Sequence, residues 1–113
     1  MFRNVYTDNL NVIKESQLLG SDDLKTVKVQ DVQNLYNFLN GNRTEEVIGK
    51  RITVQCPDGK SLSVKLLNEV ADLEQIQIGI KICLHHLTGK IYVDNKGRMA
   101  LSCSAEGWEQ VND

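Results

Sequence analysis

Three side chains that can bind a metal or act as nucleophiles lie together in the run Cys83-Leu84-His85-His86. Thiolate and imidazole are preferred zinc ligands, and a Cys–His pair is also the basis of thiol catalysis. In an extended chain Cys83 and His85 share one face while His86 points the other way, so at most two of the three reach one ion. No residue nearby in the sequence supplies the orienting acid of a catalytic pair. We therefore predict no metal site, no catalytic residue and no cofactor.

Paired carboxylates are the other groups with potential for acid–base chemistry. They occur at Asp22-Asp23, Glu45-Glu46 and Asp72-Leu73-Glu74. Each pair lies in an expected turn or near an expected helix start, where acidic side chains cap free amide groups. The sequence has neither a glycine-rich phosphate loop nor a His-Glu-x-x-His motif. We predict that the protein is not an enzyme.

The composition indicates one globular domain. The 113 residues suffice for a single core, and 41% hydrophobic with 25% charged residues is close to the globular average. No apolar run approaches the roughly 20 residues of a membrane span, and the first residues lack the layout of a signal peptide. The three cysteines are widely spaced and odd in number, which favours reduced thiols over a disulfide framework. We expect a cytoplasmic protein with no membrane contact.

Alternation of apolar and polar residues from Gly49 to Gly107 is the main indication of fold. Two alternating segments, 51–56 and 62–66, flank the turn residues 57–60 and predict a hairpin. Isoleucine at every second position from Ile76 to Ile82 predicts a third strand, with Gly79 at a bulge or a barrel corner. Further strands are expected at 25–29, 91–93 and 99–103, and residues 105–111 are compatible with either a helical turn or a closing strand.

A helix is predicted over residues 31–40. Asp31 is a suitable N-cap, and Val32, Leu35, Tyr36 and Leu39 recur at helical spacing before Asn40-Gly41. Residues 1–24 are polar and weakly periodic, so we expect a loosely structured N-terminal segment. The predicted fold is mainly β with an N-terminal helix (α+β): a single domain over residues 25–113 that contains helix 31–40 and a small OB-like β-barrel of about five to six strands over residues 50–104.

The polar face of these strands is mildly basic in a chain whose net charge is -2. Residues 49–101 carry eight basic and five acidic groups, whereas both ends of the chain are acidic. Cations that follow a phosphate backbone, with an aromatic ring to stack on a base, are typical of a surface for single-stranded nucleic acid. Lysines on strand faces also serve solubility. The candidate nucleic-acid-binding residues are Arg51, Lys65, Lys81, His85, Lys90, Tyr92 and Arg98.

Two other aromatic residues are candidates for protein contacts. Trp108 lies between Glu106 and Glu109, whose charge repels phosphate, so it suits core packing or a protein interface. Phe38 falls outside the apolar stripe of the predicted helix and is therefore expected to be accessible to a partner.

Three runs within residues 50–110 have a recognisable pattern: Ile52-Thr53-Val54-Gln55-Cys56-Pro57, Ile80-Lys81-Ile82-Cys83-Leu84 and Ser104-Ala105-Glu106-Gly107. In these runs the sequence resembles the small accessory proteins of Gram-positive conjugative transposons. One member of that family is a helicase-processivity factor for transfer and replication of the element. The resemblance thus implies a role beside single-stranded DNA, and it assigns no individual site residue.

Two functions remain open on the sequence alone. The first is a non-catalytic accessory protein that acts near single-stranded DNA in mobile-element replication or conjugative transfer, with DNA, a helicase or another protein as partner. The alternative is a protein-interaction or inhibitor module of a phage or mobile element that makes no nucleic-acid contact. Clustering of the basic residues on one face of the barrel favours the first function, and scattered cations favour the second.

Overall fold

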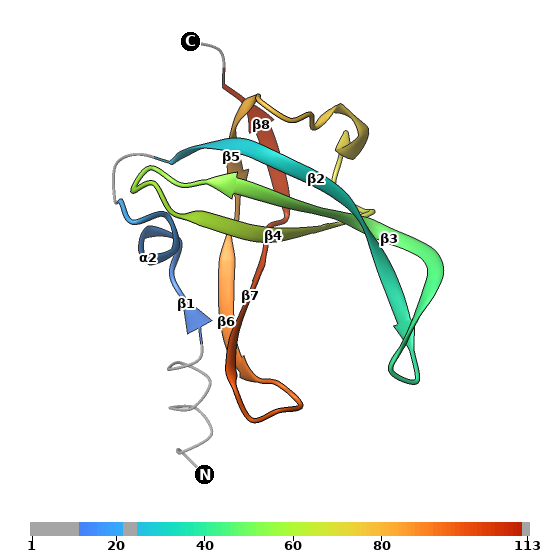
Figure 1. Cartoon of the computed structure of the whole chain (residues 1–113). Coiled ribbons are helices and arrows are strands. Elements are labelled where there is room, and N and C mark those ends of the chain that lie inside the picture. Colours follow the sequence, from blue (N-terminus) through green and yellow to red (C-terminus); the bar gives the residue numbers. More distant parts are fainter. Residues whose placement is uncertain (1–11, 22–24, 112–113) are drawn as a thin grey trace.

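The computed structural model describes residues 12–21 and 25–111, and this part of the chain is mainly β, as predicted (Figure 1). No helix within these residues is long and apolar enough to cross a membrane. The elements are β1 Val12–Ile13, α2 Glu15–Leu19, β2 Thr26–Leu39, β3 Asn42–Gln55, β4 Ser61–Leu67, the 3-10 helix η1 Leu73–Gln75, β5 Lys81–His85, β6 Thr88–Val93, β7 Met99–Ser104 and β8 Gly107–Gln110.

All of these strands belong to one sheet in the order β1-β6-β7-β4-β3-β2-β5-β8. Neighbouring strands are antiparallel except β4 and β7, which run parallel through the pairs Val64–Cys103 and Lys65–Ser104. In Figure 1, β2, β3 and β4 run across the view, whereas β5 to β8 run down it. The sheet is therefore strongly curled, and its concave side surrounds the hydrophobic core.

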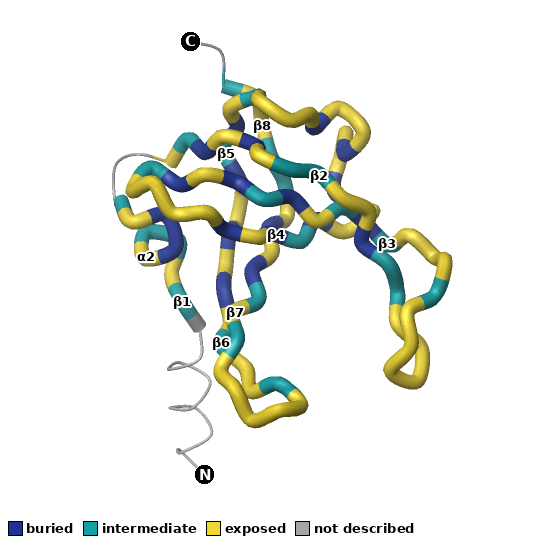
Figure 2. The backbone as a smooth tube through the Cα atoms, viewed as in Figure 1, coloured by how far each residue is buried: buried dark blue, intermediate teal, exposed yellow. Residues whose placement is uncertain are grey.

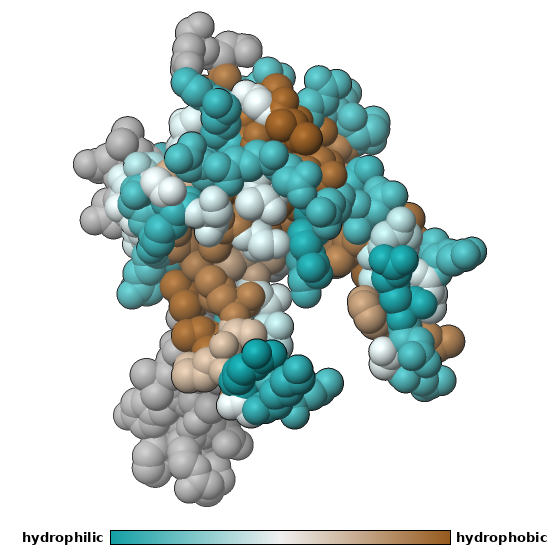
Figure 3. All heavy atoms as spheres, viewed as in Figure 1, coloured by the Kyte–Doolittle hydropathy of each residue, from teal (hydrophilic) through white to brown (hydrophobic). Residues whose placement is uncertain are grey.

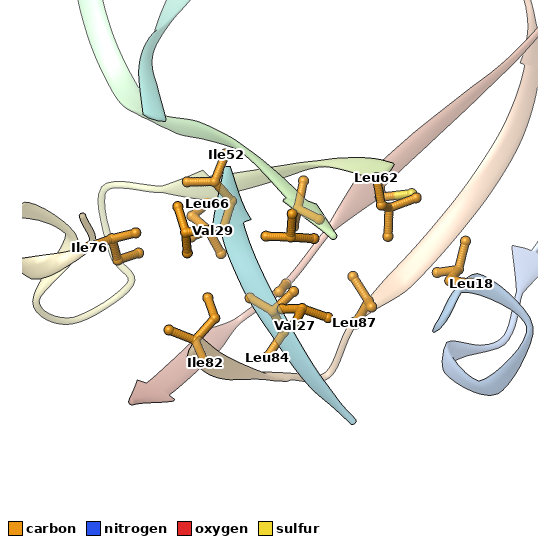
Figure 4. Close-up of a cluster of buried hydrophobic side chains, with 14 of the residues drawn as sticks. Leu18, Val27, Val29, Ile52, Leu62, Leu66, Ile76, Ile82, Leu84 and Leu87 are labelled. Carbon is orange, nitrogen blue, oxygen red and sulfur yellow. The ribbon is translucent and has the colours of Figure 1, made fainter. Parts of the chain in front are cut away.

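The core is built from alternate residues of the central strands. Ile52 and Val54 on β3 are fully buried, as is Val64 on the neighbouring strand β4. Val27 and Val29 of β2 and Ile82 of β5 pack into the same cluster, whose side chains converge between the strands (Figure 4). The predicted hairpin over residues 51–66 is confirmed by the register of β3 and β4.

The N-terminal part is more ordered than the sequence indicated. Residues 12–21 form β1 and α2, and Leu18 and Leu19 of the helix are buried in the core. Gly20 ends the helix with a positive φ of 72°, which glycine adopts without steric cost. The prediction of a loosely structured segment was therefore wrong for residues 12–21, and residues 1–11 and 22–24 lie outside the described part.

The predicted helix over residues 31–40 was also wrong. These residues lie in the long strand β2, which turns through Asn40-Gly41 into β3. Asn40 and Gly41 have φ values of 54° and 82°, and Leu39 pairs with Asn42. Positive φ at both central residues defines a two-residue hairpin loop of type I′, for which Asn-Gly is the strongest sequence signal. The dipeptide that resembled a helix end is thus a hairpin turn.

Apolar side chains on both faces explain why β2 resembled a helix. Val32 packs against the core cluster, whereas Leu35 is buried without being part of that cluster. The pairing of β2 with β3 also shifts three times: the shift between Val29 and Asp31 adds a residue to β2, and the two shifts beside Tyr36 add residues to β3. The apolar residues of β2 therefore do not follow a period of two, and their spacing imitates the period of a helix.

Two further expectations about the interior need correction. Residues 76–80 are a loop that follows η1 and turns at Gly79, with Ile78 64% exposed, so β5 begins only at Lys81. Ile76 and Ile82 still reach the core. The expected strands at 91–93 and 99–103 are present, but their apolar residues Val93 and Met99 are 67% and 74% exposed, because β6 and β7 continue beyond the packed part of the sheet.

Two hairpins extend away from the core. Residues 34–48 of β2 and β3 pair only with each other over most of their length, and we call this ribbon the β2–β3 arm. Residues 91–101 form a second hairpin, the β6–β7 arm. Both arms project from the same side of the molecule, and most of their residues are exposed (Figures 1 and 2). The β3–β4 part of the sheet lies between their bases.

Truncation of Ile52 tests this division between core and arms. We expect Ile52→Ala to lower the free energy of unfolding by about 2 to 5 kcal/mol, because it leaves a cavity in a fully buried position. Leu39→Ala, at the exposed end of the β2–β3 arm, is the matched control and should change stability by less than about 0.5 kcal/mol. Urea unfolding monitored by circular dichroism measures both, and equal effects would contradict the assignment.

Candidate nucleic-acid interface

Three connected hollows lie along the β2–β3 arm and the adjoining sheet, and Arg51 lines all of them. Their volumes are about 510, 340 and 250 Å³. We call this continuous surface the groove. It is lined by Gln33, Asn34, Leu35, Tyr36, Asn37, Phe38, Arg43, Ile48, Arg51, Ser63, Lys65, Leu67, Tyr92, Leu101, Ser102 and Cys103.

The pleat of β3 and β4 places two cations at the centre of the groove. Arg51 and Lys65 are directly paired across the two strands. Their sequence neighbours Ile52 and Val64 are also paired and are fully buried. Because successive side chains of a strand point to opposite faces, burial of the two aliphatic residues directs both cations to the outer face.

Tyr92 reaches the same groove from the β6–β7 arm. Its side chain is 49% exposed and lines the 250 Å³ hollow together with Arg51, Lys65 and Ser102. The structure thus brings together three of the predicted site residues, which come from β3, β4 and β6. Two cations beside an accessible aromatic ring can bind phosphate groups and stack against a planar base.

The other predicted site residues are distributed elsewhere. Lys90 leaves β6 on the same face as Tyr92, two residues away, but lines none of the three hollows among the described residues. Lys81 and His85 lie on β5, on the far side of β2, where Lys81 faces Lys28 and His85 Nε2 is 3.6 Å from Glu109 Oε1. Arg98 lies in the turn of the β6–β7 arm. The predicted cations therefore form a central pair and separate outlying groups.

The groove has a one-sided charge. None of the described residues that line its three hollows is acidic, whereas Arg43, Arg51 and Lys65 are basic. Two acids hydrogen-bond to amide side chains of the groove: Asp31 accepts from Gln33 at 3.0 Å, and Glu46 accepts from Asn37 at 2.8 Å. Lys65 also borders a separate hollow lined by Glu69 and Glu106, which limits the basic surface at that end.

Sequence reasoning missed most of the part of the groove that the β2–β3 arm supplies. Tyr36 and Arg43 line its largest hollow, and Phe38, predicted only as a protein contact, lines it with them. The missed signal was Asn40-Gly41, which predicts a hairpin and would have placed all three residues on one ribbon. In the space-filling view, this arm carries hydrophobic atoms among polar ones (Figure 3).

Trp108, Cys56 and Cys103 belong to the interior of the sheet or pack against it. Trp108 packs against the core, and its Nε1–H donates to the carbonyl oxygen of Ala71 at 2.9 Å. Burial raises the pKa of the Cys103 thiol, with a further contribution from Cys56, and burial followed by the charge of Asp58 raises the pKa of Cys56. A raised pKa keeps a thiol protonated at neutral pH and makes it a poor nucleophile.

The backbone changes direction at His86, the last residue of the potential metal-binding run Cys83-Leu84-His85-His86. Cys83 and His85 leave the same face of β5, and His86 follows the strand with a φ of 54°. Within residues 12–21 and 25–111, no group of three or more His, Cys, Asp or Glu side chains is arranged to hold a metal ion. Thr26 Oγ1 lies 3.9 Å from Cys83 Sγ, so the thiol has a weak polar neighbour.

The chain matches none of the protein families, curated proteins or solved structures with which it was compared. Any function must therefore be proposed from the sequence and the structure of this chain.

The turn that contains Arg98 gives a pH-dependent prediction. Asp94 accepts hydrogen bonds from the backbone N–H groups of Arg98 and Lys96, each at 2.9 Å, and pairs with the Arg98 guanidinium at 3.3 Å. The Arg98 backbone bond is the largest cause that lowers the pKa of Asp94 below its ordinary value of 3.8. Since the folded form has the lower pKa, the stabilisation is complete above pH 3.8 and is lost as the pH falls through the lowered value.

We expect an NMR titration of Asp94 to give a pKa below 3.8. The amide signals of Lys96 and Arg98 should shift in the same pH range, and Asp94→Asn should remove that response while the core signals stay unchanged. A pKa of Asp94 above 3.8 would show that these hydrogen bonds do not hold the turn.

Proposed function

We propose that this protein is a non-catalytic, cytoplasmic binder of single-stranded DNA, with Arg51 and Lys65 contacting phosphates and Tyr92 stacking on a base. The observation that carries the proposal is the groove, which holds cations and aromatic rings and, among the described residues, no acid, in a chain of net charge -2. Local charge governs the encounter with a polyanion when the basic groups are concentrated in one concave surface.

The strand connections support a barrel of the oligonucleotide-binding type. β2, β3 and β4 form a meander, β5 pairs with β2, and β7 returns parallel to β4. Only His86 and Leu87 separate β5 from β6, which pairs with β7. We infer that β5 and β6 act as one bent strand that closes the barrel, with the positive φ of His86 making the corner.

The position of the groove agrees with that proposal. In barrels of the oligonucleotide-binding type, the second and third strands and the loops at positions one–two and four–five contact the ligand. The equivalent parts here are β3, β4, the β2–β3 arm and the β6–β7 arm. Arg51 and Lys65 lie on this strand face, and Tyr92 lies on the second of these arms.

A role in mobile-element replication or conjugative transfer is the biological setting we propose, and it rests on the resemblance of residues 50–110 to accessory proteins of conjugative transposons. In such a setting, DNA is single-stranded beside a helicase. A binder with no base-reading side chains beyond stacking rings and a few amides would accept many sequences, as a processivity function requires.

A protein-interaction module is the second candidate. It is favoured by the separation of Lys81, Lys90 and Arg98 from the central cations and by exposed apolar side chains. Val93 and Met99 on the β6–β7 arm and Leu39 on the other arm are all more than 60% exposed. Exposed apolar groups gathered on one surface are typical of protein contacts. A helicase or another protein would then bind the arm ends, with or without DNA in the groove.

Salt dependence of binding tests the DNA proposal. We expect a fluorescently labelled oligothymidine to bind at low salt. Its affinity should fall as salt rises, because binding releases the salt cations that are condensed on the DNA. Lys65→Ala should reduce the slope of log K against log salt by about 0.7, the value for one contact with a single-stranded phosphate. Fluorescence anisotropy at several salt concentrations measures this slope.

Lys28→Ala is the matched control. Lys28 is an exposed strand lysine beside Lys81 and lines a different hollow, so its removal should leave the slope almost unchanged. No binding by the wild-type protein at low salt would refute the proposal. Equal loss in the two variants would show that DNA does not bind specifically in the groove.

A further inference from the structure

The β2–β3 arm carries two aromatic side chains and an arginine that are not among the contacts proposed above. The Arg43 guanidinium carbon lies 4.6 Å from the centroid of the Tyr36 ring. Phe38 is the direct cross-strand partner of Arg43. The three side chains thus form one cluster, in which a guanidinium is held against an aromatic face.

This cluster does not belong to the hydrophobic core. Phe38 is 61% exposed, and none of the three residues is part of the buried cluster described above. The arm is braced by polar bonds instead: Thr44 Oγ1 donates to the carbonyl oxygen of Asn37 at 2.9 Å, and Asn37 is bonded to Glu46. Packing therefore does not account for two aromatic rings on this ribbon.

Both rings lie at the groove. The register shifts on either side of Tyr36 are bulges whose additional residues are on β3, and bulges are common next to binding sites. Tyr36, Phe38 and Arg43 line the 510 Å³ hollow together with Arg51. The 340 Å³ hollow shares Tyr36 and Phe38 with this hollow, and it shares Lys65 with the hollow that contains Tyr92, so the three adjoin.

The chemistry of this hollow fits a nucleic-acid strand. Its described lining contains two arginines, two aromatic rings and the amides of Gln33 and Asn34, and it contains no carboxylate. Aromatic rings and guanidinium planes stack on bases, guanidinium groups pair with phosphates, and amides hydrogen-bond to base edges. An acidic peptide would use the arginines but has no need of the open rings.

We propose that Tyr36, Phe38 and Arg43 form a second base-stacking subsite for single-stranded DNA, so that one strand runs from Tyr92 past Lys65 and Arg51 onto the β2–β3 arm. This subsite rests on the proposed function, because it extends the same groove. A strand long enough to reach both arms gains the contacts of the cluster, and a short strand occupies only one part of the groove at a time.

Oligonucleotide length separates the two parts of the groove. The probes are oligothymidines of roughly 4 and roughly 16 nucleotides, the limits of site size for one barrel of this kind. For the double variant Tyr36→Leu with Phe38→Leu, the affinity for the long probe should fall roughly 5-fold to 100-fold, from the loss of base stacking. The affinity for the short probe should change by less than about 2-fold, because that probe can still bind at Arg51, Lys65 and Tyr92.

Two controls keep the result specific. Leu39→Ala removes an exposed apolar group from the same arm but outside the hollow, and it should bind both probes like wild type. If the double variant unfolds, Phe38→Leu alone, at a 61% exposed position, replaces it with an expected loss for the long probe of roughly 5-fold.

The outcomes distinguish this inference from the proposed function. Wild-type affinity of the double variant for the long probe, with weakened binding by Lys65→Ala, would overturn the arm subsite and leave DNA binding at the central cations intact. Equal losses for both probes would also overturn a separate subsite. Failure of the wild-type protein to bind either probe would overturn both proposals, and binding of an acidic peptide in place of the probes would assign the hollow to a protein partner.

Discussion

The pleat of β3 links the core of this protein to its outer surface. Ile52 and Val54 are fully buried, and the residues between and beside them, Arg51 and Thr53, necessarily point outward. A slip of one residue in the pairing of β3 with β4 would place Arg51 in the core and expose Ile52, which would cost both the hydrophobic burial and the solvation of a charge. The position of the central cations is thus held by the same aliphatic packing that stabilises the sheet. No additional element is needed to position Arg51 and Lys65 in the groove.

Where sequence periodicity follows such a pleat, the structure could be predicted. Residues 51–56 and 62–66 alternate regularly on either side of the turn 57–60, and both the hairpin and the outward direction of Arg51 and Lys65 follow from that pattern. The pattern failed at β2, because apolar residues such as Val32 and Leu35 lie on both faces of the strand and produce an apparent helical period. It also failed at Ile76–Ile80, where alternating isoleucines lie in a loop that places Ile76 inside and Ile78 outside. Periodicity reports which side chains share a face only when the backbone is regular.

The candidate site could be predicted only in part for a related reason. Alternation assigns a side chain to a face of the sheet, but it does not give the position of its strand in the sheet. Lys65 and Lys81 both point outward from their strands, yet β4 and β5 are separated by β3 and β2. The curl of the sheet then directs them to different sides of the molecule. The hairpin turn Asn40-Gly41 was available in the sequence and would have placed Tyr36, Phe38 and Arg43 on one ribbon, but the position of that ribbon beside Arg51 comes only from the structure.

The arms explain how a small domain can present aromatic rings without burying them. A two-stranded ribbon is marginally stable in water, because it has no second layer to cover its apolar side chains. The β2–β3 arm compensates with a type I′ turn, polar cross-strand bonds around Asn37, and the contact of Arg43 with Tyr36. These local interactions hold the ribbon while leaving Phe38 open to solvent. Continuity with β2 and β3 then connects the arm to the buried part of the sheet. A ligand that stacks on the rings would supply the missing second layer, so binding and ordering of the arm would reinforce each other.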